Sequence, residues 1–251
     1  METGIAQRLA CKRADPPDFA DRTGETFTED EQGLPPWKRA IDIAFTLGTS
    51  PLWLPVMFCV SLFIKFVSPG PVLFRQERIG HHGRRFTCFK FRTMRVNADT
   101  GVHQGHYSRL MTSNVPMKKL DAAGDPRLIA WGIWLRSLGL DELPQLFNVL
   151  RGDMSLVGPR PCLPYEYASY APRDRLRFDA VPGLTGLWQV SGKNKTTFVE
   201  MINMDIHYAR NKCLALDLKI LFKTIPAVLS QTKELKNEIK PVVADASLER
   251  R

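Results

Sequence analysis

Two adjacent carboxylates, Asp141 and Glu142, stand directly before the clearest helical pattern in the chain. The residues that follow mark one helical face and its end at a glycine: Leu143, Leu146, Phe147, Leu150 and Gly152. Because Pro144 is tolerated in a first turn, the pattern predicts a helix that begins near Asp141. A helix N-terminus favours phosphate, so the two carboxylates could hold a divalent metal on a phosphate, or one could attack phosphorus. The plain alternative is that Asp141 only caps the helix.

Four cations are candidates for binding a phosphate beside these carboxylates. The predicted strand 85–92 places phenylalanines on one face and Lys90 and Arg92 on the other, where they could bind phosphate or simply face solvent. Arg160 stands between two prolines that hold the backbone stiff and extended. That geometry could aim the arginine at an anion, and an exposed arginine in a turn is the alternative. Arg136 is the fourth candidate.

The chain has 251 residues and a formal net charge of +9, which suggests an acidic partner such as nucleic acid, anionic lipid or a phosphorylated substrate. No nucleic-acid recognition motif occurs, and basic residues near apolar segments fit anionic lipid better. The sequence lacks the glycine-rich loop of nucleoside triphosphatases and any kinase signature, which argues against ATP chemistry. The five cysteines show no paired spacing, so reduced thiols in a cytoplasm are the simplest interpretation.

An apolar stretch near the N-terminus is the candidate membrane segment. Residues 43–64 contain no charged side chain and would extend roughly 33 Å as a helix, enough to cross a hydrocarbon core. Ser50 and Pro51 predict a break near its middle, where the serine hydroxyl could bind a freed carbonyl. Both flanks are basic, beginning with Lys38 and Arg39, so the positive-inside rule places both ends in the cytoplasm. We therefore expect a re-entrant helix-break-helix, with a full span and a buried soluble helix as alternatives.

The patterns predict an α+β fold that is predominantly helical, with a small antiparallel strand region and interfacial amphipathic helices around the catalytic helix N-terminus. Residues 1–36 are expected to form a disordered tail and 37–66 the re-entrant membrane helix. Residues 67–230 are expected to form a cytosolic catalytic domain, followed by a charged C-terminal tail over 231–251.

Short strands are expected over 72–77 and 85–92, joined by a Gly-His-His-Gly turn. A further short strand is expected over 187–190, after a turn at 182–186. His103 and His106 could serve a metal, but they fit a solvated loop better.

Residues 197–230 are predicted to be helical in two pieces. The second piece has an apolar face that could pack on the core or lie in a membrane interface: Leu214, Leu218, Leu221, Ile225, Val228 and Leu229. Asp217 and Thr224 fall outside that face.

Several long blocks, in a fixed order, make the chain similar to a known family. The blocks are 38–43 (KRAIDI), 68–80 (SPGPVLFRQERIG), 90–94 (KFRTM), 140–146 (LDELPQL), 152–161 (GDMSLVGPRP) and 182–192 (PGLTGLWQVSG). With them the chain resembles the bacterial sugar transferases, or monotopic phosphoglycosyl transferases, over about residues 37–230. One departure is Leu138-Gly139, where the family more often has a serine or threonine.

The resemblance implies an enzyme that transfers hexose 1-phosphate from a UDP-sugar to undecaprenyl phosphate and releases UMP. It implies that Asp141 is the nucleophile that forms a covalent phosphosugar intermediate. Glu142 would be its partner, helping to hold Mg²⁺ or to position the acceptor. Lys90 and Arg160 resemble the family's phosphate-binding cations, and Asp217 lies in the family's Leu-Asp-Leu segment without an assigned role.

The chain resembles the short family members that initiate exopolysaccharide biosynthesis, which favours UDP-galactose or UDP-glucose. An N-acetylated amino sugar for O-antigen, capsule or glycoprotein glycans is an alternative, as is a non-catalytic membrane adaptor. The implied partners are the UDP-sugar donor, the polyprenol phosphate acceptor and lipid of the bacterial inner membrane, with the catalytic domain facing the cytoplasm. Whether the chain forms a homodimer stays open.

Overall fold

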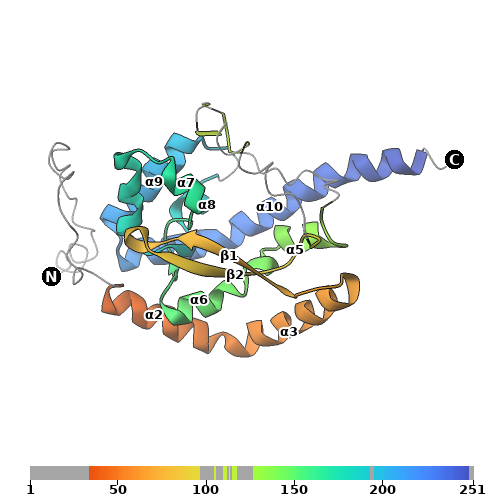
Figure 1. The fold of residues 1–251 in the computed structure, drawn as a ribbon, viewed down its shortest axis with the longest axis horizontal. Coiled ribbons are helices and arrows are strands. Elements are labelled where there is room, and N and C mark those ends of the chain that lie inside the picture. The colour runs from red at the N-terminus through yellow and green to blue at the C-terminus, as the bar shows by residue number, and fades with distance from the viewer. Residues whose placement is uncertain are drawn as a thin grey trace, which may run out of the picture.

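The computed structural model describes residues 34–96, 105, 110–111, 113, 115–117, 127–192 and 195–248, with side chains up to residue 230 and at residue 232. His103, His106 and the expected tail before residue 34 lie outside these residues. The elements are α2 (Pro36–Gly48), α3 (Ser50–Val67), β1 (Leu73–Ile79), η1 (His81–Gly83), β2 (Arg85–Phe91), α5 (Gly132–Ser137), η2 (Leu140–Glu142), α6 (Gln145–Arg151), β3 (Ser155–Val157), α7 (Pro164–Ala168), η3 (Pro172–Asp179), β4 (Gly183–Thr185), α8 (Leu187–Val190), α9 (Phe198–Asn211) and α10 (Leu214–Leu248) (Figure 1). The predicted α+β fold with mostly helical content is confirmed.

The apolar N-terminal segment forms two helices that meet at an angle. α2 and α3 are separated by Thr49, and the two helices run as an open V along one side of the molecule (Figure 1). The hydroxyl of Ser50 donates to the carbonyl of Leu47 at 2.7 Å, as expected for a break at Ser50 and Pro51. Pro55, in contrast, is accommodated inside α3. The predicted helix-break-helix is therefore present.

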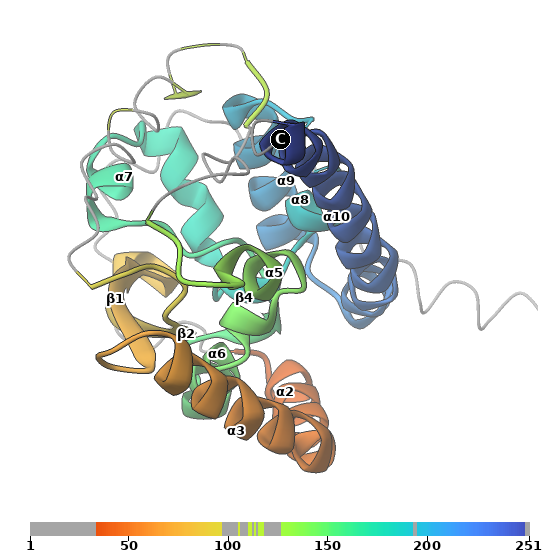
Figure 2. The ribbon, with the colours of Figure 1, turned by 90° about the vertical axis from the view of Figure 1, so that its right-hand side faces the viewer.

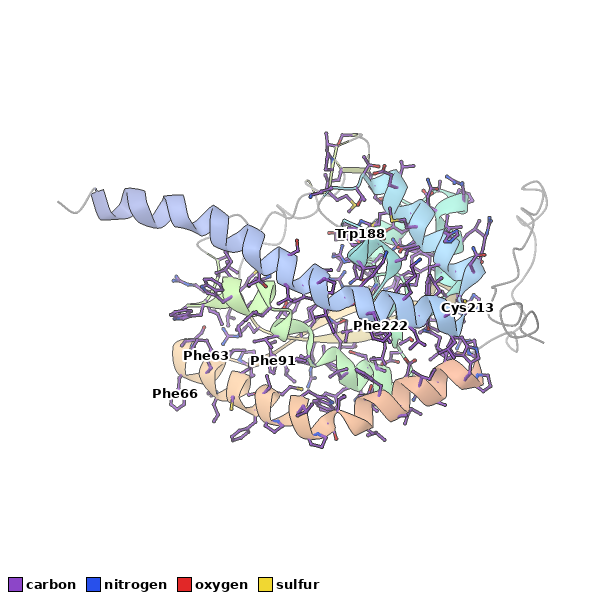
Figure 3. All side chains as sticks on the ribbon, turned by 180° about the vertical axis from the view of Figure 1, so that it is seen from behind. Phe63, Phe66, Phe91, Trp188, Cys213 and Phe222 are labelled. Atoms are coloured by element: carbon purple, nitrogen blue, oxygen red, sulfur yellow. The ribbon has the colours of Figure 1, made fainter. Side chains whose placement is uncertain are left out.

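One stripe of α3 belongs to the main hydrophobic core. Trp53, Met57, Val60 and Ile64 recur at helical spacing and are all buried, and Ile64 is completely inaccessible. They pack in a cluster with residues of β2, α5, α6, β3 and α9. The opposite surface of α3 is exposed and apolar, and Phe66 points away from the rest of the molecule (Figure 3). Among the described residues, α3 is the one helix whose length and composition would allow it to cross a membrane.

The two strands predicted around the Gly-His-His-Gly turn form a hairpin. β1 pairs antiparallel with β2, and the register places Phe74 opposite Lys90. The 3-10 turn η1 joins them, with His82 in the left-handed region at φ 50°. The hairpin lies between α3 and α7 (Figures 1 and 2), with β1 in contact with α7 and β2 in contact with α6 and η2.

A second strand pair corrects two predictions. Gly183–Thr185 was expected in a turn but forms β4, which pairs parallel with β3. Leu187–Val190 was expected as a strand but forms the helical turn α8. The reason is a close backbone approach, because a Cβ on Gly183 would lie 2.0 Å from the amide nitrogen of Gly158. Glycines at both positions let the two backbones pair where the sequence pattern indicated only a turn.

The two predicted C-terminal helices are present as α9 and α10, and of the two alternatives for the apolar face of α10, packing on the core does not hold for most of its residues. Asp217 and Ile220 are buried, and Thr224 Oγ1 lies 2.8 Å from Thr185 Oγ1. The large exposed apolar residues of α10 are Leu214, Leu218, Phe222, Ile225 and Leu229, of which Phe222 is labelled in Figure 3. Polar contacts of Asp217 and Thr224, together with the buried Ile220, thus orient this helix. α10 also continues to Leu248, through most of the predicted charged tail.

The packing of α3 predicts a difference between its two faces. Ile64→Ala removes a fully buried side chain shared with the catalytic region and should lower the free energy of unfolding by about 2–5 kcal/mol. Phe58→Ala, on the exposed face, should change it by less than about 0.5 kcal/mol. Thermal unfolding of both variants in detergent measures this difference. Equal losses would contradict the packing of α3 on the catalytic region.

Candidate functional site

Asp141 and Glu142 lie in the 3-10 turn η2 and not in the first turn of α6. The prediction of a helix that begins near Asp141 is therefore wrong. The cause is Pro144, which lacks an N–H group and whose ring would clash with the carbonyl four residues earlier. The chain forms shorter-range bonds instead, such as the amide of Leu143 donating to Leu140 O at 3.3 Å. The two carboxylates therefore precede α6 and do not lie in its first turn.

The observed helix α6 agrees in part with the helix predicted from the sequence. It ends at Gly152, which adopts φ 90° as expected for a glycine stop. Leu146 and Val149 are buried in the core. Phe147 is 39% exposed and packs edge-on against Trp53 of α3, with ring centroids 5.6 Å apart. The predicted apolar face is thus shared between the core and the membrane segment.

The central feature of the site is an ion pair between two predicted residues. Lys90 Nζ lies 2.8 Å from Glu142 Oε1, with both side chains partly exposed. Asp141, the adjacent carboxylate, is 7% exposed. β2 therefore brings a cation to the acidic turn from about fifty residues earlier in the chain. This geometry holds Glu142 in place and adds positive charge next to Asp141.

A buried asparagine positions β2 at this point. The side-chain oxygen of Asn148 accepts from the amide of Phe89 at 3.1 Å, and its Nδ2 donates to Thr87 O at 2.8 Å and to Asp153 Oδ2 at 3.1 Å. Asn148 is completely buried. It thus connects α6 to the two residues that flank Cys88 on β2, immediately before Lys90. Nothing in the sequence pattern indicated this role.

The predicted extended segment around Arg160 is fixed through its backbone. The buried Arg177 donates to Arg160 O at 3.0 Å, and the buried Arg78 donates to Pro161 O at 3.2 Å. Burial lowers the pKa of Arg78, and the nearby positive charge of Arg160 lowers it further. Arg177 is also paired with the buried Asp205, so the two buried arginines position the backbone of this segment.

Several charged residues of the site also affect the pKa of one buried thiol. Burial raises the pKa of Cys88, while the positive charges of Lys90 and Arg160 lower it and the negative charge of Glu142 raises it. Arg160 therefore acts on the same region of β2 as the Lys90–Glu142 pair. The structure brings these predicted residues into one neighbourhood.

The other two candidate phosphate-binding cations, Arg92 and Arg136, have different surroundings. Arg92 is buried and binds the connection after α3, donating to Pro71 O at 2.6 Å and to Ser68 O and Oγ at 2.9 Å. These contacts give the guanidinium a structural role, so Arg92 is not an exposed strand cation as the alternation suggested. Arg136 is partly buried on α5, which packs against η2.

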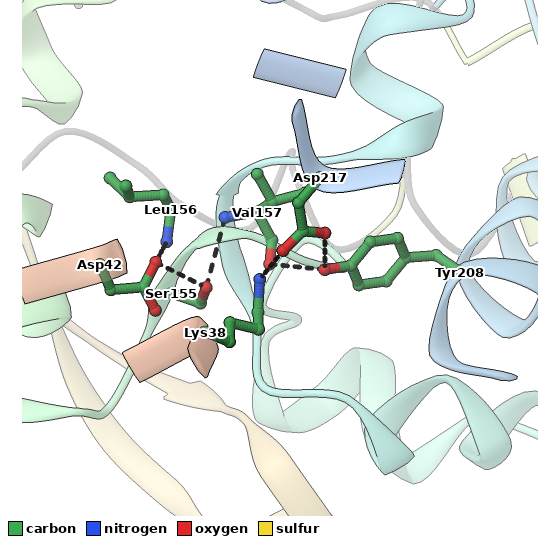
Figure 4. A network of polar contacts seen from close by, with 7 residues as sticks. All are labelled: Lys38, Asp42, Ser155, Leu156, Val157, Tyr208 and Asp217. Atoms are coloured by element: carbon green, nitrogen blue, oxygen red, sulfur yellow. Dashed lines mark hydrogen bonds and ion pairs between the residues drawn. The ribbon is translucent and has the colours of Figure 1, made fainter. Parts of the chain in front are cut away.

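Asp217 lies in a buried polar network, the part of the structure drawn in Figure 4. Its carboxylate pairs with Lys38 Nζ at 2.5 Å and accepts from the Tyr208 hydroxyl at 2.7 Å. The residue therefore joins α10 to α2 and α9. Its role in this structure is to connect elements, and the sequence alone gave no partner for it.

The acidic turn fits Mg²⁺ only as part of a larger complex. The described residues contain no group of three or more side chains able to hold a metal ion. Asp141 and Glu142 supply carboxylate oxygens, and Mg²⁺ is commonly held by one or two carboxylates together with substrate phosphates and water. The donor set is thus compatible with a metal that binds with a diphosphate substrate.

Comparison with known proteins identifies relatives across most of the chain. The family model for bacterial sugar transferase matches residues 34–231. The exopolysaccharide production protein ExoY of Sinorhizobium fredii is 41% identical over 195 residues, which is 76% of this chain and 84% of the relative. The UDP-glucose:undecaprenyl-phosphate glucose-1-phosphate transferase of Caulobacter vibrioides is 40% identical over 201 residues, 77% of this chain and 70% of the relative.

A longer relative shares the same region. The undecaprenyl-phosphate galactose phosphotransferase of Salmonella typhimurium is 39% identical over 199 residues, 76% of this chain and 40% of the relative. The resemblance seen in the sequence blocks is confirmed by these matches, and the carboxylate turn with its lysine lies inside the matched region. The chain belongs to the bacterial sugar transferase family.

Proposed function

We propose that this protein transfers hexose 1-phosphate from a UDP-sugar to undecaprenyl phosphate, releases UMP and so initiates an exopolysaccharide. The observation that carries the proposal is the Lys90–Glu142 ion pair beside the buried Asp141. The names of the relatives support galactose or glucose as the sugar and exopolysaccharide production as the process.

The chemistry follows from the charges involved. A UDP-sugar diphosphate is anionic, so a carboxylate can approach phosphorus only when cations reduce the repulsion. Lys90 and Arg160 supply positive charge, and Mg²⁺, when bound, would supply more and polarise the phosphate. Lys90 also keeps Glu142 close to the reacting group.

In the proposed reaction, a carboxylate oxygen of Asp141 attacks the β-phosphorus and forms a new P–O bond. The bond between that phosphorus and the bridging oxygen breaks, and UMP leaves with the electron pair. An oxygen of undecaprenyl phosphate then attacks the same phosphorus and releases the Asp141 carboxylate. Dividing the reaction in this way means that the nucleotide sugar and the lipid need not react with each other directly.

We further propose that α2 and α3 enter one leaflet and return, so that the catalytic region faces the cytoplasm. Both ends of the α2–α3 unit bind the same body: Lys38 pairs with Asp217, and Arg92 binds the backbone at Ser68. α3 is about 27 Å long as a helix, so a full span would separate its ends by most of a bilayer. The core contacts along α3 support a helix that stays against the catalytic region.

The direct test is UMP release by the purified full-length protein with undecaprenyl phosphate and a panel of UDP-sugars. We expect release with UDP-galactose or UDP-glucose, loss of release with EDTA and recovery when Mg²⁺ is added. An N-acetylated amino sugar as the preferred donor would change the proposed substrate. No release with any donor would favour a non-catalytic adaptor.

The nucleophile is tested by exchange of labelled UMP into UDP-sugar without the lipid acceptor. Asp141→Asn should abolish both exchange and turnover, because an amide cannot form the covalent intermediate. Glu77→Gln removes the same charge at an exposed position paired with Arg85 and should leave both rates unchanged. Exchange at the normal rate in Asp141→Asn would refute Asp141 as the nucleophile.

The topology is tested by single cysteines introduced at the exposed positions Ala40 and Val67, in a variant whose native cysteines are replaced. In sealed inverted membrane vesicles, an impermeant thiol reagent should label both positions, because both lie at the cytoplasmic surface. Labelling of one position only in inverted vesicles, and of the other only in right-side-out vesicles, would show a full span.

A further inference from the structure

Three polar residues of α2 point into the catalytic region and not toward lipid or solvent. Lys38, Arg39 and Asp42 lie within about one turn of the helix, and we call them the α2 joint. Lys38 is 3% exposed and Asp42 is 1% exposed. Lys38 and Arg39, which the sequence analysis placed in a basic membrane flank, therefore bind other parts of the protein.

Arg39 binds the end of the helix that follows the acidic turn. Its guanidinium donates to Val149 O at 2.5 Å and to Leu150 O at 2.6 Å. The last carbonyls of a helix have few amide partners within the helix, and an arginine can bind two of them at once. Here the carbonyl of Val149 also accepts from the amide of Gly152 at 3.1 Å. α6 has only seven residues. A helix of that length is not stable by itself, so external contacts must hold it.

Asp42 binds the strand that leads to Arg160. Its Oδ1 accepts from the Ser155 hydroxyl at 3.1 Å and from the amide of Leu156 at 3.0 Å (Figure 4). At the end of the same strand, the Tyr208 hydroxyl lies 3.0 Å from the carbonyl of Val157. α2 thus contacts both segments that carry functional side chains: α6 after Glu142, and β3 before Arg160.

We propose that Arg39 is a positioning residue for the proposed transferase reaction, on which this inference rests. It fixes α6 and therefore holds the Asp141–Glu142 turn against Lys90. The role depends on the forked shape of the guanidinium and not only on its charge, because two separate nitrogens each bind one carbonyl, whereas a lysine offers a single nitrogen. The membrane segment is in this way part of the structure that aligns the site.

The test compares Arg39→Lys and Arg39→Gln with Lys65→Gln, using the full-length protein in lipid nanodiscs. Lys65 is exposed near the end of α3, so its replacement removes one positive charge from the same membrane unit without touching α6. Hydrogen–deuterium exchange of residues 140–151 reports the position of the turn without requiring turnover. Steady-state kinetics are measured in parallel, and binding to anionic vesicles is measured with the same variants before they are placed in nanodiscs.

Both Arg39 variants should exchange roughly tenfold faster over residues 140–151, with the rest of the catalytic region unchanged. Their kcat should fall roughly tenfold while KM for the UDP-sugar changes less than about twofold, because alignment and not donor binding is affected. Lys65→Gln should match the wild type in exchange and kcat. Arg39→Lys keeps the charge, so it remains informative if Arg39→Gln does not fold.

Wild-type exchange and kcat in Arg39→Lys would overturn the proposal. Equal losses of vesicle binding and activity in Arg39→Gln and Lys65→Gln would also overturn it, because they would assign Arg39 to lipid headgroups. Absence of UMP release from the wild type would refute the transferase reaction instead. In that case the exchange data alone would still decide whether Arg39 positions the turn.

Discussion

The structure depends on holding two adjacent carboxylates close to each other and to cations. Carboxylates repel one another and repel phosphate, so an acidic turn is useful for phosphate chemistry only beside compensating positive charge. The ion pair between Lys90 and Glu142 supplies that charge at 2.8 Å. Because Lys90 is on β2 and Glu142 is on η2, every element that fixes these two segments contributes to the site.

Several of those elements are far from the reacting groups. Asn148 connects α6 to the backbone of β2. Arg78 and Arg177 bind the backbone beside Arg160. Each of these contacts uses a buried polar group that is costly to leave without a partner, so the arrangement is specific as well as stable. The site is therefore set by a buried hydrogen-bond network more than by any single loop.

The membrane segment and the catalytic region form one body in this protein. α3 contributes a buried stripe to the main core, and the polar residues of α2 bind α6, β3 and α10. A segment that is apolar enough for lipid thus also serves as a wall of the catalytic region. In the membrane arrangement proposed above, these contacts would keep the carboxylate turn at a fixed distance from the lipid surface.

The sequence by itself determined several local elements and the family. The helix break at Ser50 and Pro51, the β1–β2 hairpin, the glycine stop at Gly152 and the family were all predictable, since each depends on residues close together in the chain or on contiguous motifs. The start of α6 was mispredicted, although the clash caused by Pro144 is local. Tertiary structure decided the partners of the charged residues: it paired Lys90 with Glu142, placed Arg92 on the backbone at Ser68, and turned Asp217 inward to Lys38. These pairings depend on burial and on distant partners. Lys90 and Glu142 are more than fifty residues apart in the chain, and Lys38 and Asp217 are more than a hundred residues apart. Periodicity in the sequence carries no information about those distances.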